Sequence, residues 1–216
     1  MTRGIVLLSG GLDSLVSLGI TKDIKLALTF DYGQKSADYE IRASKAICDY
    51  YEIEHKVIKL DWLKDITHTA LVSDGDLPQG IENPKESAKS VWVPNRNGLF
   101  LNIAAAFADS EDYDFIVIGA NKEEGQTFPD NSKEFIERVN LEFEFSTLKK
   151  PKVIAPLLNC VKNDIVKLAL ENNVPLRLVR SCYAGGEKHC GMCESCTRLK
   201  NALIANGDTK FIKELF

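Results

Sequence analysis

Short runs of consecutive apolar residues alternate with stretches of mixed polarity along the first half of the chain. Branched and aromatic side chains fill these runs, as is typical of strands that are buried on both faces of a sheet. In the stretches between them, apolar residues recur every three or four positions, which is the period of a helix with one buried face. The pattern predicts strands at residues 4–8, 26–30 and 55–60 and helices at 14–20 and 36–51.

A stretch without periodicity separates this half of the chain from a second half, in which apolar runs again alternate with helical patterns. Residues 67–91 show no period and are rich in turn-forming residues, which predicts a long loop. Beyond the loop, the pattern predicts strands at 115–119 and 153–155 and helices at 97–109, 130–148, 162–171 and 194–205. Asp130 or Ser132 would cap the second of these helices. Because strands that alternate with helices form parallel sheets through right-handed crossovers, the sequence predicts an α/β fold, a parallel sheet with helices on both faces.

Charge and composition narrow the class of protein. The 216 residues include 27 basic and 31 acidic side chains, giving a net charge of −4, and 44% of them are hydrophobic. This composition supports a folded core and lacks the basic surface of a non-specific nucleic-acid binder. No apolar stretch approaches the ~20 residues needed to cross a bilayer, and no secretory signal is recognisable. We therefore expect a cytoplasmic protein with no direct nucleic-acid or membrane partner.

The predicted first strand leads into the sequence SGGLDS, residues 9–14, at the start of a helix. Tandem glycines let the backbone turn tightly and present its N–H groups to an anion, and the helix start adds its positive dipole end. Ser9 and Ser14 offer hydroxyl donors, while Asp13 could cap the helix or hold Mg²⁺. The sequence is neither Gly-Lys-Ser/Thr nor Gly-x-Gly-x-x-Gly, which excludes those two phosphate motifs. It predicts a phosphate-binding loop, and an ordinary strand-to-helix turn is the alternative.

Four of the six cysteines crowd into one short segment, at Cys182, Cys190, Cys193 and Cys196. Gaps of two residues let one turn present two thiolates to the same ion, and four thiolates make the tetrahedral site that structural zinc prefers. Such a site has no open position for water, so we expect a structural metal centre. An iron–sulfur cluster, or His189 in place of one cysteine, is the alternative. Cys48 and Cys160 are expected to be small core residues.

The SGGLDS sequence after an N-terminal strand resembles the PP-loop of the N-type ATP pyrophosphatases, which have an adenine nucleotide alpha hydrolase-like fold. Together with the cysteine segment and the sequences DYGQ (31–34), VPNRN (93–97), GAN (119–121) and FPD (128–130), it resembles the 7-cyano-7-deazaguanine synthase family over essentially the whole chain. The resemblance implies an ATP-dependent ligase that converts 7-carboxy-7-deazaguanine and ammonia to 7-cyano-7-deazaguanine through an adenylated carboxylate and an adenylated amide. It also implies ATP, Mg²⁺ and one structural Zn²⁺ as bound groups, on the route to queuosine or archaeosine.

The same resemblance assigns roles to individual residues. It implies a catalytic role for Ser9, Asp13, Ser14 and Arg96. It implies nucleotide contacts for Leu8, Ser9, Gly10, Gly11, Leu12, Asp13, Ser14 and Phe30, with Leu8 and Phe30 flanking the adenine. Substrate contacts are expected at Tyr32, Gln34, Arg96, Asp130 and Glu134.

Elementary chemistry supports the substrate contacts. Arg96 precedes a predicted helix, where its guanidinium could bind a carboxylate or phosphate with two hydrogen bonds; a surface cation is the alternative. Tyr32 and Gln34 follow the carboxyl end of a strand, where a planar base could stack and hydrogen-bond; ordinary loop residues are the alternative. A guanine-like ring presents two adjacent N–H donors, which one carboxylate, Asp130 or Glu134, could accept together; helix capping is the alternative.

We expect one compact unit with two parts, a PP-loop domain over residues 1–180 and a zinc-binding segment with a C-terminal helix over residues 181–216. The resemblance implies small-molecule substrates and a homodimer. Three other functions remain open: a PP-loop enzyme that adenylates a different carboxylate, a tRNA thiolase, and a non-catalytic nucleotide-binding zinc protein. The acidic net charge and the clustered cysteines disfavour the thiolase.

Overall fold

The computed structural model describes residues 2–73, 76–79 and 90–216. Five strands form one parallel sheet in the order β3-β2-β1-β4-β5. The strands are β1 (Gly4–Leu7), β2 (Ile24–Asp31), β3 (Glu54–Lys59), β4 (Phe115–Val117) and β5 (Lys152–Ile154). The chain moves outward from β1 to β3 and restarts on the other side of β1 with β4. This order confirms the predicted parallel sheet and creates a crevice between β1 and β4, where sheets of this kind bind ligands.

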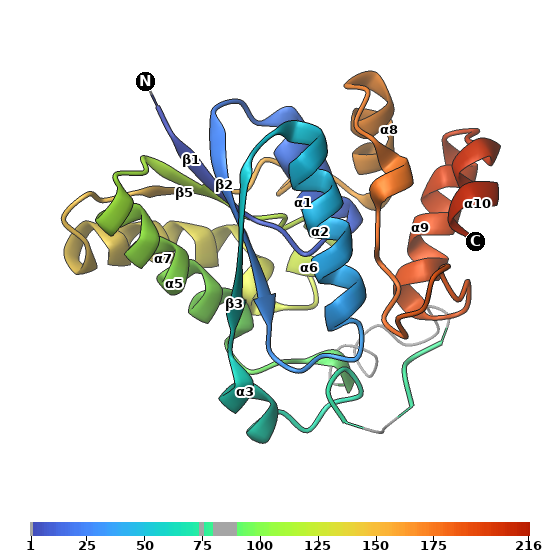
Figure 1. Cartoon of the computed structure of the whole chain (residues 1–216), viewed down its shortest axis with the longest axis horizontal. Helices are drawn as coiled ribbons and strands as arrows, with labels where there is room; N and C mark the ends of the chain where they lie inside the picture. Colours follow the sequence, from blue (N-terminus) through green and yellow to red (C-terminus); the bar gives the residue numbers. More distant parts are fainter. Residues whose placement is uncertain (1, 74–75, 80–89) are drawn as a thin grey trace.

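Helices cover both faces of the sheet (Figure 1). On one face lie α1 (Leu12–Ile20) and α2 (Ala37–Tyr51), and on the other lie α5 (Arg96–Glu111) and α7 (Lys133–Ser146). Beside α1 come α8 (Lys162–Glu171), then α9 (Glu194–Ala205) and α10 (Thr209–Leu215). The short helical turns are α3 (Asp61–Asp65), α6 (Lys122–Gly125), η1 (Pro129–Asn131) and η2 (Leu176–Leu178).

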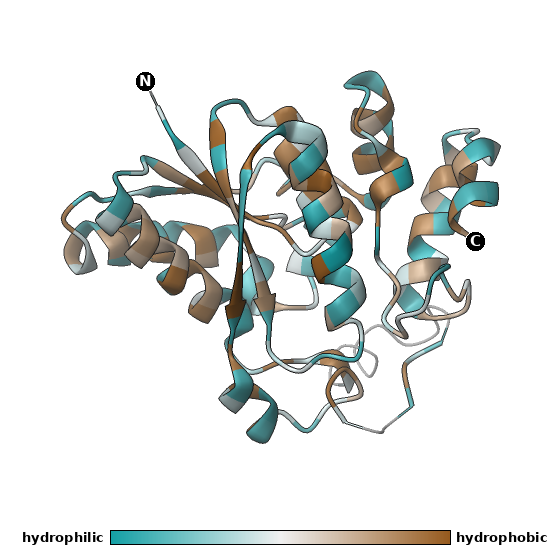
Figure 2. Ribbon diagram, viewed as in Figure 1, coloured by the Kyte–Doolittle hydropathy of each residue, from teal (hydrophilic) through white to brown (hydrophobic). Residues whose placement is uncertain are grey.

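Successive residues at the first strand supply the two halves of the core. Ile5 and Leu7 pack into the apolar cluster under α5 and α7, whereas Val6 and Leu8 pack into the cluster under α1, α2 and α8. Side chains alternate between the two faces of a strand, so one short apolar run serves both layers. In Figure 2 the apolar residues concentrate along the central strands, while polar residues are frequent along α2.

The C-terminal helices share this core. Leu199 and Leu203 of α9 and Leu215 of α10 belong to the same buried cluster as Val6. The cysteine segment is thereby held against the sheet domain on its α1 side. Within the described ranges, no helix is long and apolar enough to cross a membrane.

Most predicted elements have bounds within two residues of those expected, and α8 and α9 match them residue for residue. The clearest difference precedes α7. Asp130 belongs to the 3-10 turn η1, and the helix starts at Lys133, because the Ser132 hydroxyl accepts the N–H of Phe135 at 3.1 Å. The predicted start at residue 130 is therefore wrong, and Ser132 is the N-cap.

Three short helices, α3, α6 and α10, were not predicted, because four to seven residues are too few to show a helical period. The loop predicted at 67–91 lies partly outside the described residues, at 74–75 and 80–89. Its described portion contacts the cysteine segment, where Gln79 forms an isolated bridge with Cys193.

Candidate active site

A cavity of about 270 Å³ opens at the carboxyl ends of β1, β2 and β4. Segments that are far apart in the sequence line it: the SGGLDS loop, the end of β2, the start of α5, the turn α6 and the first residues of α8 and α9. This is the crevice that the strand order creates. The cavity therefore brings together the predicted phosphate loop, Arg96 and the border of the cysteine segment.

Two glycines set the shape of the SGGLDS loop. Gly10 has a φ of +76°, and a Cβ on it would lie 2.9 Å from the Cβ of Ala43 on α2. A Cβ on Gly119, just after β4, would lie 2.9 Å from the backbone nitrogen of Ser14. A side chain at either position would force neighbouring atoms to move. The loop is thus fixed between α2 and the end of β4.

Serine hydroxyls accept the backbone N–H groups of the SGGLDS loop. The amide of Ser9 donates to the Oγ of Ser14 at 3.3 Å, and that of Gly11 donates to the Oγ of Ser9 at 3.4 Å. The amide of Leu12 donates to the Oγ of Ser181 at 3.3 Å. These bonds are long, and α1 begins without a side-chain cap. A phosphate oxygen is a stronger acceptor than a hydroxyl, so the loop can exchange these partners for a polyphosphate.

Asp13 belongs to a partly buried ion cluster beside the loop. The Nζ of Lys162 lies 2.5 Å from Oδ2 of Asp13 and 2.9 Å from Oε1 of Glu124. Burial raises the pKa of Asp13 to about 6, against the opposing effect of Lys162. Burial alone would lower the pKa of Lys162, but the two carboxylates raise it on balance, so the lysine stays cationic.

The second oxygen of Asp13, Oδ1, is buried and has no hydrogen-bond partner among the described residues. Burying a carboxylate oxygen without a partner is costly, which points to a ligand at this position. Carboxylate oxygens are the ligands that Mg²⁺ prefers, so Asp13 and Glu124 fit this ion. Sequence reasoning missed Glu124 and Lys162, because they stand on separate helices and approach Asp13 only in the folded chain.

Arg96, the first residue of α5, lines the cavity. Its NH1 donates to the hydroxyl of Tyr32 at 3.3 Å. Burial alone would lower the pKa of Arg96, but Tyr32 and the carboxylates of Asp130 and Glu124 raise it on balance. Burial raises the pKa of Tyr32, so its phenol stays protonated. The structure thus places a fixed cation and a hydroxyl side by side, and Arg96 is not a surface cation.

Gln34 lies outside the cavity lining and forms hydrogen bonds to three residues that line it. Its Oε1 accepts the N–H of Tyr32 at 3.0 Å, and its Nε2 donates to the carbonyl of Phe30 at 3.1 Å. The same Nε2 donates to Oε2 of Glu40 at 3.0 Å, and the Ser36 hydroxyl donates to Oε1 of Glu40 at 2.6 Å.

Glu40 itself lines the cavity. Burial raises its pKa, while the hydrogen bonds from Ser36 and Gln34 oppose that effect. Each carboxylate oxygen has two acceptor sites, so each keeps one for a ligand. Glu40 is an oriented acceptor that sequence reasoning missed; its only signal was an acidic residue in the first turn of α2.

The two apolar residues predicted to flank an adenine both line the cavity. Leu8 follows β1, and Phe30 lies near the end of β2. The ring of Phe30 stacks on Phe100 of α5, with 3.9 Å between the ring centroids and 4° between the planes. One face of Phe30 is therefore covered, and the apolar surface offered to a ligand includes both rings. Gly10 lies behind the lining, where its carbonyl accepts the N–H of Arg180 at 2.7 Å.

Neither carboxylate that the sequence assigned to the deazaguanine edge is part of the cavity lining. The oxygens of Asp130 accept the N–H of Asn97 at 3.3 Å and the Nδ2 of Asn131 at 3.1 Å. Glu134 is exposed on α7. Asp130 instead joins the start of α5 to the turn η1, next to Arg96.

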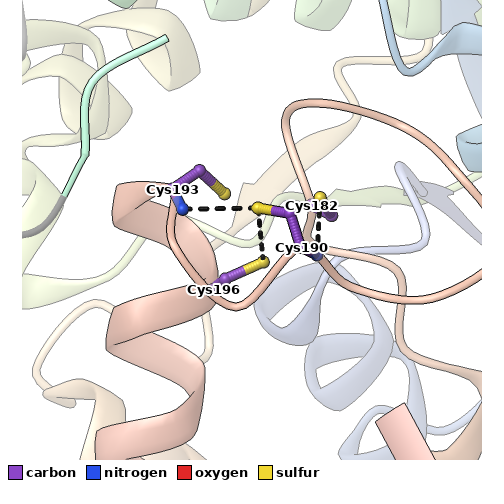
Figure 3. A group of neighbouring side chains, drawn as sticks. All are labelled: Cys182, Cys190, Cys193 and Cys196. Atoms are coloured by element: carbon purple, nitrogen blue, oxygen red, sulfur yellow. Dashed lines mark hydrogen bonds between the residues drawn. The ribbon is translucent and has the colours of Figure 1, made fainter. Parts of the chain in front are cut away.

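Four sulfur atoms gather where the chain after η2 meets α9 (Figure 3). All four lie within 4.8 Å of one another, and those of Cys190 and Cys196 are 3.8 Å apart. Tetrahedral zinc with sulfur bonds of about 2.3 Å requires sulfurs about 3.8 Å apart, so the cluster fits such an ion. The N–H groups of Cys190 and Cys193 donate to the sulfurs of Cys182 and Cys190, which stabilises thiolates.

His189, the alternative ligand, and the two cysteines predicted for the core are not part of the sulfur cluster. The Nε2 of His189 accepts the N–H of Ser181 at 3.0 Å, so this ring is not directed at the sulfur cluster. Cys48 is buried in the core, and Cys160 packs against the same cluster of apolar residues, as predicted.

Known proteins of one family are similar to this chain over most of its length. A family model described as queuosine biosynthesis protein QueC matches residues 3–207. A 7-cyano-7-deazaguanine synthase from Methanosarcina mazei is 48% identical, covering 93% of this chain and 93% of its own length. One from Carboxydothermus hydrogenoformans is 50% identical, covering 95% of this chain and 100% of its own length.

A solved structure described as a predicted subunit of a tRNA methyltransferase from Methanocaldococcus jannaschii has a TM-score of 0.51 and 16% identity. It covers 100% of this chain and 92% of its own, and at this identity the likeness shows the fold alone. The family model and the two synthases together decide the family. The chain belongs to the 7-cyano-7-deazaguanine synthase family.

Proposed function

We propose that this chain is an ATP-dependent ligase that forms 7-cyano-7-deazaguanine from 7-carboxy-7-deazaguanine and ammonia. The observation that carries the proposal is the placement of the SGGLDS loop and the cluster of Asp13, Lys162 and Glu124 in one cavity with Arg96. A polyphosphate site beside a partly buried guanidinium suits a reaction that joins a nucleotide phosphate to a carboxylate. The family relatives make the deazaguanine carboxylate the best-supported substrate.

The SGGLDS loop would bind the β- and γ-phosphates of ATP through its backbone N–H groups and its serine hydroxyls. Asp13 and Glu124 would hold Mg²⁺, which supplies neutralisation of the phosphate charge. Lys162 would then pair with a phosphate oxygen. Donors that are already in position stabilise the negative charge of the departing pyrophosphate as it develops. Leu8 and Phe30 would contact the adenine.

In the first reaction, an oxygen of the substrate carboxylate attacks the α-phosphorus of ATP, and the bond from this phosphorus to pyrophosphate breaks. A carboxylate is a poor electrophile, and adenylation gives its carbon a good leaving group. Arg96 would bind the carboxylate and hold it in line with that phosphorus, supported by the Tyr32 hydroxyl. Ammonia then adds to the acyl carbon, and AMP and a proton leave to give the amide.

A second ATP would convert the amide to the nitrile. The amide oxygen attacks the α-phosphorus and pyrophosphate leaves. Loss of AMP from carbon and of the protons from nitrogen then forms the carbon–nitrogen triple bond. One cavity can perform both rounds, because the attacked phosphorus and the departing pyrophosphate are the same in each.

Glu40 is the group that we assign to the deazaguanine edge. It lines the cavity, and its two oxygens each keep an acceptor site after binding Ser36 and Gln34. A deazaguanine ring presents a ring N–H and an adjacent amino group, and one carboxylate can accept both. Gln34 and Ser36 would fix the direction of that carboxylate.

Glu40→Gln is expected to weaken binding of 7-carboxy-7-deazaguanine by about 10–100-fold, because a charged acceptor of two hydrogen bonds is lost. ATP binding should change less than about two-fold. Calorimetric titration of each ligand measures both. An analogue without the 2-amino group should bind weakly to the unmodified protein, and Glu40→Gln should no longer distinguish it from the substrate. Asp130→Asn is the matched control, and loss of discrimination in that variant alone would return the role to Asp130.

For the four cysteines we propose one Zn²⁺ bound by Cys182, Cys190, Cys193 and Cys196. Four thiolates complete the tetrahedron, so the ion would have a structural role and no water to activate. Metal analysis and absorption spectroscopy of protein purified without air distinguish zinc from an iron–sulfur cluster.

The products of ATP test the proposed reaction. With ATP, Mg²⁺, ammonium and 7-carboxy-7-deazaguanine, the protein is expected to release AMP and pyrophosphate and to form the nitrile, as followed by mass spectrometry. Omitting the carboxylate should stop turnover. ADP and orthophosphate as the only products would contradict adenylation. AMP release with a different carboxylate, and not with this one, would favour the alternative that the enzyme adenylates another acid.

A further inference from the structure

Two consecutive residues just before the first cysteine of the cluster contact the SGGLDS loop. The N–H of Arg180 donates to the carbonyl of Gly10 at 2.7 Å. The hydroxyl of Ser181 accepts the N–H of Leu12 at 3.3 Å and lines the cavity. The loop near the start of the chain is therefore held on both sides of its second glycine by the residues that precede Cys182.

Ser181 is itself held by a hydrogen bond to a histidine of the cysteine segment. His189, which precedes Cys190, accepts the N–H of Ser181 on its Nε2 at 3.0 Å. Its Nδ1 lies 3.2 Å from the carbonyl of Leu215, which requires a hydrogen on Nδ1 and leaves Nε2 as the acceptor. His189 is 5% exposed, so these contacts fix the orientation of its ring.

The positions of Ser181 and His189 therefore depend on the sulfur cluster. Ser181 precedes Cys182, and His189 precedes Cys190. The N–H of Cys190 donates to the sulfur of Cys182 at 3.4 Å. A metal bound to both sulfurs would fix the distance between the two chain segments. It would thereby fix the hydroxyl of Ser181 against the loop.

The hydroxyl of Ser181 can also bind a phosphate directly. When a phosphate oxygen accepts the hydrogen bond of the Leu12 N–H, the Ser181 hydroxyl no longer receives the hydrogen bond that it accepts in the free protein. The same oxygen then faces the phosphate and can donate its own hydrogen to it. A hydroxyl serves both states because it is acceptor and donor.

We propose that the four-cysteine centre supports the phosphate loop through His189, and that Ser181 contributes a hydroxyl to the polyphosphate bound there. Ser181 is a binding residue, and His189 is a positioning residue that acts through it. The proposal deepens the function proposed above and shares with it only the assumption that the loop binds a nucleotide polyphosphate.

Calorimetric titration of the full-length protein with inorganic pyrophosphate and with ATP, together with metal analysis, tests this. Ser181→Ala should keep one metal per chain and bind pyrophosphate about 10-fold more weakly, because a hydrogen bond to a charged group is lost. Ser181→Thr should restore the affinity. His189→Leu should weaken pyrophosphate binding with the metal retained, and His189→Gln should recover part of it, because its side-chain oxygen can accept the N–H of Ser181.

Met192→Ser is the matched control, since Met192 is 61% exposed within the same segment, and it should change neither measurement. Unchanged pyrophosphate affinity in Ser181→Ala would overturn the role of the hydroxyl, and so would metal loss in that variant. Unchanged affinity in His189→Leu would overturn the link to the cysteine centre. These outcomes are independent of the substrate: protein that binds pyrophosphate but does not adenylate the deazaguanine carboxylate would refute the proposed function alone.

Discussion

Asp13→Asn is expected to lower the rate of AMP and pyrophosphate formation by about 10²–10³-fold, the usual effect of removing one electrostatic group at the reacting centre. Asparagine has the shape of aspartate and no charge. It would leave Lys162 with one carboxylate partner in place of two, and it would remove a ligand of the proposed Mg²⁺ site. The measurement is the initial rate of product formation at saturating ATP and substrate.

Asp49→Asn is the control for this variant, because Asp49 forms an exposed ion pair with Lys45 outside the cavity lining and should leave the rate unchanged. Titration with Mn²⁺ in the presence of a non-hydrolysable ATP analogue supplies a second readout, in which Asp13→Asn should bind the metal more weakly. A rate within two-fold of the unmodified protein would remove Asp13 from the proposed mechanism.

Cys196→Ser is expected to have the largest effect on stability. Cys196 is 0% exposed, at the first turn of α9, and its sulfur lies against that of Cys190. Structural zinc in small domains contributes binding free energy of about 10 kcal/mol or more at neutral pH, which exceeds the ~1–3 kcal/mol of most single substitutions. Loss of the metal should therefore lower the melting temperature and expose the segment after residue 181 to protease.

The matched control is Cys160→Ser, which removes a partly buried thiol outside the sulfur cluster and should keep both the metal and most of the stability. Metal content, thermal unfolding and limited proteolysis are measured on both variants. Full metal content in Cys196→Ser would contradict the four-cysteine site and point to ligation by the other three cysteines.

The fold was predictable because local patterns of apolar and polar residues indicate most of its strands and helices. The apolar run at residues 4–8 indicated a strand buried on both faces, and Ile5 and Val6 do face opposite halves of the core. The helices at 162–171 and 194–205 carry a clear period and appear with those bounds. The start of α7 was misplaced because Asp130 and Ser132 are both good N-caps, and only the turn η1 decides between them.

The site was predictable where its chemistry is contiguous in the sequence, or where a residue follows a strand end or begins a helix, as Tyr32 and Arg96 do. The SGGLDS loop and the four cysteines each occupy one short segment, and the structure keeps them compact. Glu40, Glu124 and Lys162 are single charged residues on ordinary amphipathic sequence, where nothing distinguishes them from solvent-facing charges. The sheet order and the helix starts bring them to the cavity. Gln34, which the sequence predicts as a substrate contact, lies outside the cavity lining and binds Glu40 through its amide.

The contact between Leu12 and Ser181 spans 169 residues, and it sets a condition on how the newly made chain acquires ligand affinity. At ~5–20 residues per second, the glycine turn leaves the ribosome about 10–30 s before the serine that completes it. Leu215, whose carbonyl accepts a hydrogen bond from the His189 ring, is synthesised later still. The complete loop environment therefore exists only in the finished protein, whereas the sheet of a nascent chain depends on its strand pairing and apolar packing.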